Sequence, residues 1–577
     1  MKKSRKREAQ KAPAAIAKPR RMTSWAIPLA VAAALLGVFW AYSPAFHGVF
    51  LFDDNVLPFA LPNVAEPLKN WITGVRPVLM FSYWINAHIS GEDTFSYHIF
   101  NLIIHCITSG LIFVVARRLL QWSEIEEPRP GWLAGFAAAL FLLHPMQTEA
   151  VAYLAGRSEA LSAMFFFAAY AVFLCRKYSA VSWGVVVAVL LLFGCAVLSK
   201  ENAIALPALL LLTDYYWNPG FSFQGIRENW KLYVPILIGA VGGVAFFWDL
   251  ITHATTAGFA LKDFTWYQYF FTQCRALFVY LGLFVLPVHL TADWDFPISR
   301  NIFAHGAIVG LVVLLALVAA AWHYRRRYPL SSFGFFVFLV LMAPTSSILP
   351  IRDPIAERRI YAAMLGLLLI VVDVMSRVKI RRQALAAACA VVLLFAAGMT
   401  YARAGVWSTE ISLWEDTVQK SPDKPRVHFQ LGSAYYDAGK CDLAVEQFQR
   451  TAQLQTPNYN LLVDWALAYD CLNQAGNALD KLHEAAKLEP TAHVYSQIGM
   501  VYAKRSEWAN ALDALATAQK IDPSFAITYV YLGGVHLATN HAAEAVQDYQ
   551  HALALDPSIE QARQGLEQAQ ARMRAGG

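Results

Sequence analysis

The stretch "LGSAYYDAGKCDLAVEQFQRTAQLQTP" (431–457) is the first of four similar segments that fill the last quarter of this 577-residue chain. A small residue near the start of each segment recurs every 33 or 34 residues, at Gly432, Ala466, Gly499 and Gly533. A proline at the end of each recurs with the same spacing, at Pro457, Pro490, Pro523 and Pro557. A fixed period of about 20–50 residues is typical of stacked repeats. We therefore predict four helix pairs over 424–557, in which the small residue lets two helices approach and the proline ends the second.

The repeated pattern resembles the tetratricopeptide repeat. Residues 558–577 are polar and are predicted to form a capping helix and tail, as the last unit of a repeat array does. The resemblance implies a soluble α-solenoid that binds a peptide or scaffolds an assembly, so we expect a substrate or partner protein to bind to these repeats. A rigid stalk without a ligand is the alternative.

Two of the seven cysteines lie within these repeats. Cys441 opens the second helix of the first pair, and Cys471 closes the first helix of the second pair. Those helices are expected to pack antiparallel, which brings the two thiols together. An oxidising compartment would then favour a disulfide; the alternative is that both are small core residues. No Cys/His spacing typical of a zinc site occurs.

Upstream of the repeats, residues 25–402 carry one apolar run after another. The chain is 57% hydrophobic and only 15% charged, with a mean hydropathy of +0.39, whereas soluble proteins average about 25% charged residues. A spanning helix needs about 20 apolar residues, which makes the candidate spans 25–45, 97–117, 131–148, 158–175, 181–198, 201–217, 232–250, 302–324, 331–349, 358–376 and 383–402. The predicted fold is all-α: a polytopic membrane domain over 25–402, a connector over 403–423 and the solenoid.

The positions of Lys and Arg predict the orientation of the spans, because positively charged loops stay in the cytoplasm. Residues 1–24 hold nine of them and are predicted to be a cytoplasmic tail before a retained signal anchor; a cleaved signal peptide is the alternative. The basic loops agree with the span count if 265–289, which carries Arg275, is interfacial or re-entrant. We predict about eleven crossings, a cytoplasmic amino terminus and repeats on the outer face.

Polar residues cluster in the short loops on that outer face. Asp53 and Asp54 are adjacent in "FDDN" (52–55), and neighbouring carboxylates raise each other's pKa, which suits one of them to act as a base. A bound divalent ion and a solvated pair that merely ends the first span are the alternatives. The other members are Arg76, His98, Asn101, His105, His144, Glu149, Arg157, Glu159, Lys200, Glu201, Glu357, Arg358, Arg359 and Tyr361. Singly, each is more often structural; together, their cations suit the phosphate of a lipid.

A family resemblance rests on the segments "FDDN", "RPV", "YHIFNLIIH", "LHPMQTEAVAYLAGRSE", "LSKEN", "DWDFP" and "ERRIY". Together with the repeats, they resemble the integral-membrane, C-type glycosyltransferases, and most closely the transmembrane-and-tetratricopeptide-repeat relatives of the protein O-mannosyltransferases. The most specific part is 144–159. The resemblance implies transfer of a sugar, typically mannose, from a polyprenyl-phosphate donor to Ser or Thr hydroxyls of proteins, with inversion at the anomeric carbon.

The resemblance also implies roles for individual residues. Asp53 would be the general base, Asp54 would orient the acceptor or the sugar, and Arg358 would bind the lipid phosphate. Further candidates for substrate or donor binding are Arg359, Lys200, Arg157, Glu149, His98, His144, Arg76 and Glu201. The relatives need no metal for this step, so we expect no metal or other cofactor beyond the lipid-linked donor, although an acidic pair can hold a divalent ion.

The expected partners are the polyprenyl-phosphate sugar, an acceptor protein or peptide, and membrane lipids; no nucleic acid is expected. The predicted location is a bacterial inner membrane with the repeats in the periplasm, and the endoplasmic reticulum is the alternative. Two other functions compete: glycosylation of a lipid or polysaccharide, and a non-enzymatic membrane scaffold or transporter. The one-sided clustering of polar residues argues against a transporter, whose charges lie at mid-depth.

Overall fold

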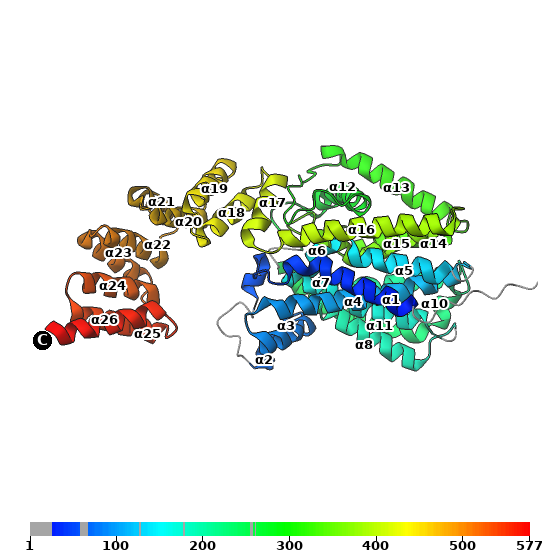
Figure 1. Cartoon of the computed structure of the whole chain (residues 1–577), viewed down its shortest axis with the longest axis horizontal. Helices are drawn as coiled ribbons and strands as arrows, with labels where there is room; N and C mark the ends of the chain where they lie inside the picture. The colour runs from blue at the N-terminus through cyan, green and yellow to red at the C-terminus, as the bar shows by residue number, and fades with distance from the viewer. Residues whose placement is uncertain are drawn as a thin grey trace, which may run out of the picture. The chain divides into compact units, whose positions relative to one another are not determined.

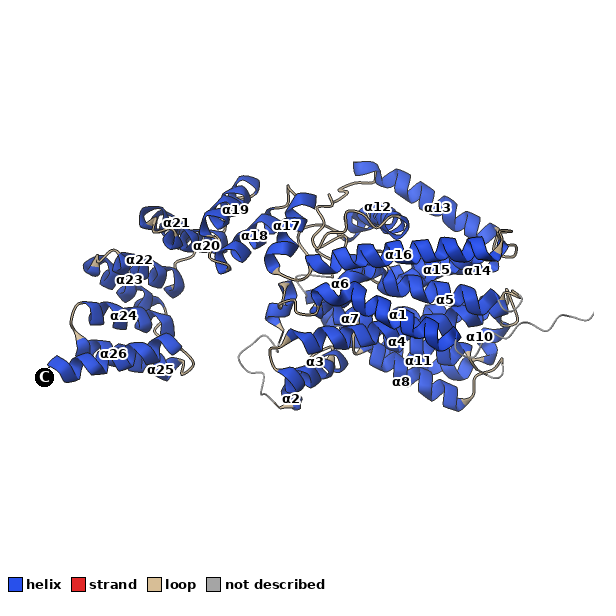
Figure 2. Ribbon diagram, in the orientation of Figure 1, coloured by secondary structure: helices blue, strands red, loops and turns tan. Residues whose placement is uncertain are grey.

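The computed structural model describes residues 26–57, 67–125, 129–176, 179–253, 258–259 and 261–576. Within these ranges every regular element is a helix (Figure 2), so the predicted all-α class is confirmed. The chain divides into two compact units, which we describe separately. The membrane unit comprises 1–290 and 297–408, and the repeat unit comprises 291–296 and 409–577.

The membrane unit contains six helical segments that are long and apolar enough to cross a bilayer, among the described residues. They are 28–45, 94–122, 154–174, 304–323, 357–377 and 382–406. They include α1 (Ala26–Tyr42), α4 (Thr94–Trp122), α7 (Arg157–Leu174), α13 (Ala307–His323), α15 (Ile360–Arg377) and α16 (Arg382–Val406). Further apolar helices are shorter than 18 residues. Six of the predicted spans are therefore supported, and the count of eleven stays a prediction.

The remaining helices complete the membrane unit (Figure 1). The longest of them are α3 (Pro77–Ser90), α5 (Arg129–Leu143), α8 (Trp183–Val197), α9 (Leu206–Trp217), α11 (Trp230–His253), α12 (Trp266–Val285) and α14 (Pro329–Met342). Single turns are α2 (Leu68–Trp71), α6 (Thr148–Val151), α10 (Gln224–Glu228), η2 (Phe52–Val56), η5 (Leu154–Gly156), η6 (Glu201–Ala205) and η8 (Glu357–Arg359).

Three predicted spans are shorter as helices than the sequence prediction, and a proline accounts for each. Segment 131–148 stops being α-helical at Leu143, because Pro145 forces His144 into an extended conformation. Segment 201–217 begins as an α-helix only at Leu206, where Pro207 occupies the first turn. Segment 331–349 ends at Met342, ahead of Pro344. The prediction had counted these flanking polar turns as part of the spans.

The helix α7 forms the centre of the membrane unit. Fourteen of its 18 residues are buried, and it packs against α4 and α8. Burial all round is typical of a helix enclosed by others. By contrast, Ala307 is the only buried residue among the described positions of α13, as expected for a helix that faces lipid. The centre of the unit is therefore built on α7, whose first turn carries Arg157 and Glu159 of the predicted site.

The segment predicted to be interfacial, 265–289, forms the helix α12. Figure 1 shows α12 nearly end-on, whereas α13 to α16 run across the picture. Arg275 donates to the carbonyl of Pro297 at 2.9 Å and to Ser299 Oγ at 3.0 Å. The helix is not among the six long apolar segments. Its interfacial position stays a prediction.

The repeat unit consists of α17 (Glu410–Lys420), four helix pairs and a last helix. The pairs are α18 (Pro425–Asp437) with α19 (Cys441–Leu454), α20 (Tyr459–Cys471) with α21 (Ala475–Leu488), α22 (Ala492–Lys504) with α23 (Trp508–Ile521), and α24 (Ala526–Ala538) with α25 (Ala542–Leu555); α26 (Glu560–Gly576) follows. A Cβ on Gly499 would lie 2.6 Å from Leu515, and one on Gly533 would lie 2.9 Å from Tyr549. The recurring small residue is thus required by the close approach within a pair, and the predicted solenoid is confirmed.

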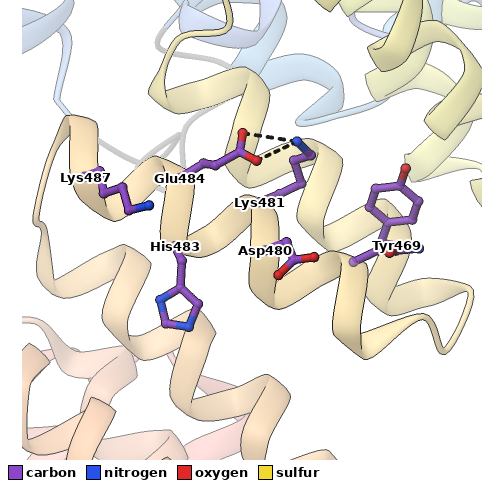
Figure 3. Close-up of a pocket in the computed structure, with 7 residues that line it drawn as sticks. Tyr469, Asp480, Lys481, His483, Glu484 and Lys487 are labelled. Atoms are coloured by element: carbon purple, nitrogen blue, oxygen red, sulfur yellow. Dashed lines mark hydrogen bonds and ion pairs between the residues drawn. The ribbon is translucent and has the colours of Figure 1, made fainter.

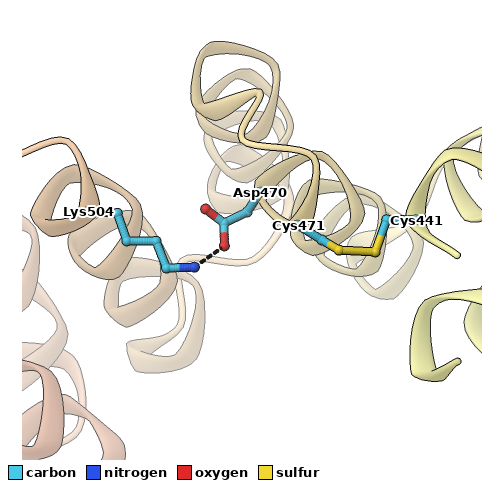
Figure 4. The surroundings of a disulfide bond; sticks show 4 residues. All are labelled: Cys441, Asp470, Cys471 and Lys504. Carbon is cyan, nitrogen blue, oxygen red and sulfur yellow. Dashed lines mark hydrogen bonds and ion pairs between the residues drawn. A yellow bond between two sulfur atoms is a disulfide. The ribbon is translucent and has the colours of Figure 1, made fainter. Parts of the chain in front are cut away.

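Two features join parts of the repeat unit that are distant in sequence. Cys441 and Cys471 form a disulfide between the first residue of α19 and the last of α20, with 6.2 Å between the Cα atoms (Figure 4). Asp293, from the predicted outer segment "DWDFP", accepts from Lys424 at 2.5 Å and from Arg426 at 2.6 Å. The predicted connector, 403–423, contains the end of α16 and all of α17.

Candidate active site

The acidic pair lies on a 3-10 turn, η2, that follows α1. The two carboxylates differ in their surroundings: Asp53 is exposed, whereas Asp54 is buried at 1% exposure. Asp54 accepts from the backbone amide of Leu51 at 3.0 Å and from that of Ala155 at 2.7 Å. Among the described residues, the Asp53 carboxylate has no hydrogen bond or ion pair. Asp54 therefore holds the loop in place, and Asp53 presents an exposed carboxylate without a partner among the described residues.

Burial dominates the electrostatics of Asp54. It raises the pKa of Asp54 to about 8, against the effects of the two backbone hydrogen bonds and of Arg157, which lower it. The neighbouring charge of Asp53 raises it further. When Asp54 is protonated, each of its carboxyl oxygens can still accept a hydrogen bond, one from the amide of Leu51 and one from that of Ala155. Near neutral pH the buried Asp54 carboxyl is therefore mostly protonated.

The segment 144–159 forms the wall against which this loop packs. Tyr153 accepts a hydrogen bond from the backbone amide of Asp53 at 2.9 Å. Gly156 has no room for a side chain, because a Cβ there would lie 2.4 Å from the carbonyl oxygen of Glu149. The lack of a side chain lets η5 fold back on α6. Tyr153 and the amide of Ala155 consequently both face the acidic loop.

Three cations and three acids form neighbouring ion pairs in the membrane unit. Glu149 pairs with the Arg358 guanidinium and also accepts from the Arg358 backbone amide at 2.8 Å. Lys200 pairs with Glu159 at 2.7 Å. Arg76 forms a bidentate ion pair with Glu201, in which Nη2 lies 2.7 Å from Oε1 and Nε lies 3.1 Å from Oε2.

These cations lie near one another. Burial lowers the pKa of Lys200; the Glu159 carboxylate raises it, and the charges of Arg76 and Arg358 lower it. The side chains of Arg358 and Arg76 stay 27% and 34% exposed, and that of Lys200 is 12% exposed. The structure thus brings together six predicted site residues from four separate segments, with partly accessible cations among them.

Other predicted residues are placed differently. Arg157 is completely buried, and its guanidinium donates to Asn101 Oδ1 at 2.6 Å, to Asn86 Oδ1 at 2.7 Å and to the Tyr97 carbonyl at 3.1 Å. It also stacks over the ring of Tyr83. Such a guanidinium is committed to the fold, which leaves it unsuited to a lipid phosphate.

The predicted histidines and Arg359 bind the backbone. His98 lies 3.4 Å from the Gly48 carbonyl, and His144 lies 3.0 Å from that of Phe284. Arg359 donates to the carbonyls of Asp353 and Pro354 at 2.6 and 2.8 Å. Both histidines are buried. These contacts fix the three side chains against the backbone, and their predicted part in substrate binding stays a prediction.

Sequence reasoning missed Tyr153, which the structure places against the acidic loop. Its ring stacks on Trp407 with 5.3 Å between centroids. A search for charged and histidine residues passes over an uncharged tyrosine. The available signal was its position inside 144–159, the most specific segment of the family resemblance.

Neither unit contains a metal site that the structure can define. Among the described residues, no group of three or more His, Cys, Asp or Glu side chains is placed to hold an ion. Both oxygens of Asp54 already accept backbone amides. The acidic pair therefore does not offer two free carboxylates to one cation.

The repeat unit has an open hollow of about 320 Å³ on α20 and α21 (Figure 3). It is lined by Tyr469, Asn477, Asp480, Lys481, His483, Glu484 and Lys487. Within this lining, Lys481 forms an ion pair with Glu484, three residues later on α21, and its Nζ lies 4.6 Å from the centroid of the Trp465 ring. The lining mixes both signs of charge, so it does not indicate one class of ligand.

Comparisons with known proteins find relatives that match much of the chain. No protein-family model matches the chain. The protein O-mannosyl-transferase F38B6.6 of Caenorhabditis elegans is 23% identical over 444 residues, which are 72% of this chain and 61% of that protein. The protein O-mannosyl-transferase TMTC3 of Mus musculus is 23% identical over 533 residues, 83% of this chain and 57% of that protein. TMTC2 of the same organism is 30% identical over 171 residues, 28% of this chain and 20% of that protein.

Solved structures similar to the chain include tetratricopeptide-repeat proteins. MamA is 24% identical and covers 26% of this chain and 86% of its own, with a TM-score of 0.23. The tetratricopeptide-repeat protein TTC0263 of Thermus thermophilus is 22% identical and covers 31% of this chain and 95% of its own, with a TM-score of 0.26. Because these TM-scores are low, the assignment of the repeat fold rests on the helix pairs of this structure.

The fold and the site together define an integral-membrane protein with a carboxyl-terminal tetratricopeptide-repeat solenoid. The chain is a relative of proteins named protein O-mannosyl-transferase, and the predicted resemblance is confirmed. The chain spans about six tenths or less of the length of the curated relatives described above.

Proposed function

We propose that this chain transfers a sugar, most simply mannose, from a polyprenyl-phosphate donor to Ser or Thr hydroxyls of proteins on the non-cytoplasmic side of a membrane. The observation that carries the proposal is the exposed carboxylate of Asp53, whose backbone amide donates to Tyr153 in the same short segment that holds the partly accessible Arg358 through Glu149. The relatives named protein O-mannosyl-transferase support the same class of reaction.

Asp53 acts as the general base in this scheme. The acceptor hydroxyl oxygen attacks the anomeric carbon while its proton passes to the Asp53 carboxylate. The bond between the sugar and the phosphate oxygen breaks, and polyprenyl phosphate leaves with both electrons. Attack opposite the leaving group inverts the anomeric centre. Asp54 supports this step through the loop, because its buried carboxyl anchors η2 to Leu51 and Ala155.

The cations balance the charge that develops on the leaving phosphate. Arg358 is the first candidate, because Glu149 orients it while leaving part of its side chain accessible. Lys200 and Arg76 are the next candidates, each oriented by its own carboxylate. Preorganised cations of this kind stabilise charge without having to reorient during the reaction. Arg157 and Arg359 serve in our scheme as supports, because buried or backbone acceptors occupy them.

The repeat unit would bind the acceptor protein or a partner. Its disulfide supports a location in an oxidising compartment, since disulfides are rare in the cytosol. This agrees with the predicted orientation, in which the repeats and the Asp53 loop lie on the same outer side. We propose the periplasm of a bacterium as that compartment, with the lumen of the endoplasmic reticulum as the alternative.

The test uses the full chain in lipid nanodiscs with polyprenyl-phosphate mannose and candidate outer-compartment proteins. Hexose transfer is measured by intact-protein and peptide mass spectrometry for wild type and Asp53→Asn. We expect transfer to Ser or Thr by wild type and a loss of at least a hundredfold in Asp53→Asn. Equal transfer by both proteins would refute the role of Asp53.

A matched control removes another carboxylate of the membrane unit. Asp263 is about half exposed and pairs with Arg352 at 3.3 Å, so Asp263→Asn should cost little stability and leave transfer unchanged. Hexose found only on lipid or polysaccharide would favour the second function. No transfer with any acceptor would favour a scaffold.

A further inference from the structure

We propose that Tyr153 is a positioning residue that fixes the Asp53 loop relative to the Arg358 cation. The inference rests on the proposed function, because it assigns a role within that reaction. It adds a residue with no charge of its own, whose contribution lies in where it holds the groups that react.

The contacts of Tyr153 reach the acidic loop directly. Its hydroxyl oxygen accepts a hydrogen bond from the backbone amide of Asp53 at 2.9 Å. The ring of Phe52, the residue before Asp53, meets the Tyr153 ring edge to face, with 6.3 Å between centroids. On its other side, the ring stacks on Trp407 at 5.3 Å with 23° between the planes. The side chain is therefore wedged between η2 and the end of α16, and only 2% of Tyr153 is exposed.

The same short segment holds the cation. Glu149, four residues earlier, binds both the backbone amide and the guanidinium of Arg358. Ala155, two residues later, donates its amide to Asp54. Residues 149–155 therefore contact the proposed base loop at one end and the proposed phosphate cation at the other. The spacing between the two depends on this segment.

The charges around the hydroxyl agree with this placement. Burial raises the pKa of Tyr153, the carboxylates of Asp54 and Asp53 raise it further, and Arg358 lowers it. The hydroxyl thus stays protonated at neutral pH and lies within the influence of both the acidic pair and the cation. A neutral hydroxyl suits positioning, because it accepts the Asp53 amide without adding charge to the site.

Tyr153→Phe separates the hydroxyl from the ring. The ring keeps its stacking on Trp407, but the Asp53 amide loses its acceptor. We expect kcat to fall at least tenfold, with the KM for donor and acceptor within twofold of wild type, because the base loop is misplaced while the binding groups remain. Amide hydrogen exchange in the peptide 50–57 should rise in the same variant, and the melting temperature should stay within about two degrees.

Tyr170→Phe is the matched control. Tyr170 is also fully buried, and its hydroxyl bonds to Thr213 Oγ1 at 2.9 Å, in the neighbourhood of Arg176 and Asp214. We expect neither kcat nor the exchange of peptide 50–57 to change in this variant.

Three outcomes would overturn the proposal, and they are distinguishable. A Tyr153→Phe kcat within twofold of wild type would refute the positioning role and leave the proposed function standing. A fall in kcat together with faster exchange throughout the membrane unit would show a general structural role instead. An inactive wild type would refute the proposed function and this role with it.

Discussion

Replacing both Cys441 and Cys471 with serine should loosen the first two repeats and leave the last two nearly unchanged. The bond closes a loop with a sequence separation of 30 residues. Loop-closure entropy for that length corresponds to about 3.6 kcal/mol at 25 °C. Each repeat contacts only its neighbours, so this loss should appear locally as an increase of a few hundredfold in the opening of α19 and α20, at about 1.4 kcal/mol per factor of ten.

Hydrogen exchange measured by mass spectrometry on the full chain in nanodiscs would test this expectation. Amides of α19 and α20 should exchange a few hundredfold faster in the double variant, whereas those of α24 to α26 should change little. The ion pair between Lys504 and Asp470, which joins α22 to α20 (Figure 4), remains in the variant and should confine the effect. The exposed Cys175 supplies the control, Cys175→Ser. An increase below tenfold in α19 and α20, or an equal increase in all repeats, would refute the reasoning.

The same disulfide reports the side of the membrane on which the repeats lie. The chain has seven cysteines, so alkylation after denaturation without reductant should label five of them if the bond forms in cells. Labelling of all seven would contradict the proposed outer location, since an oxidising compartment is required. The double serine variant fixes the expected count independently, because its remaining five thiols should label in either case.

Three further predictions concern the membrane unit. Asp54→Asn should lower its stability by about 1–3 kcal/mol, because the amide group faces one buried backbone N–H with no acceptor; a melting temperature equal to wild type would contradict this. Since burial raises the pKa of Asp54 to about 8, above its value of about 4 in an unfolded chain, the folded state holds a proton that the unfolded state has lost. The contribution of protonated Asp54 to the free energy of unfolding is therefore complete below about pH 4 and is lost as pH rises through about 8. The difference in melting temperature between wild type and Asp54→Asn should consequently narrow from pH 5 to 9. A difference that widens over this range would contradict a raised pKa of Asp54. Arg358→Gln should raise the KM for the donor about 10- to 100-fold, because a charge-assisted bond contributes about 1.5–3 kcal/mol, while Arg352→Gln, at an exposed pair, should leave it unchanged.

Much of the architecture follows from local patterns in the sequence. The recurrence of Gly432, Ala466, Gly499 and Gly533 sets the register of the helix pairs, and each of the three glycines lies against a bulky neighbour within its own pair. That register also brought Cys441 and Cys471 to meeting helix ends. Of the eleven apolar runs predicted to span the membrane, six form long apolar helical segments among the described residues, whereas prolines at 145, 207 and 344 shortened other helices. Periodicity and length are properties of neighbouring residues, and a single sequence displays them directly.

The division of labour within the candidate site depends on contacts between distant segments. In the sequence, Asp53 and Asp54 are adjacent and chemically alike; only packing against Ala155, 101 residues away, buries one and leaves the other exposed. Arg358 was the first candidate for the phosphate and Arg157 a further one; the structure pairs Arg358 with Glu149, 209 residues away, and encloses Arg157. The sequence by itself determined the repeat register, the long apolar helices and the set of polar residues. Only the tertiary structure decided which of those polar groups stay accessible, because the burial and partners of a charged side chain depend on segments that no local pattern connects.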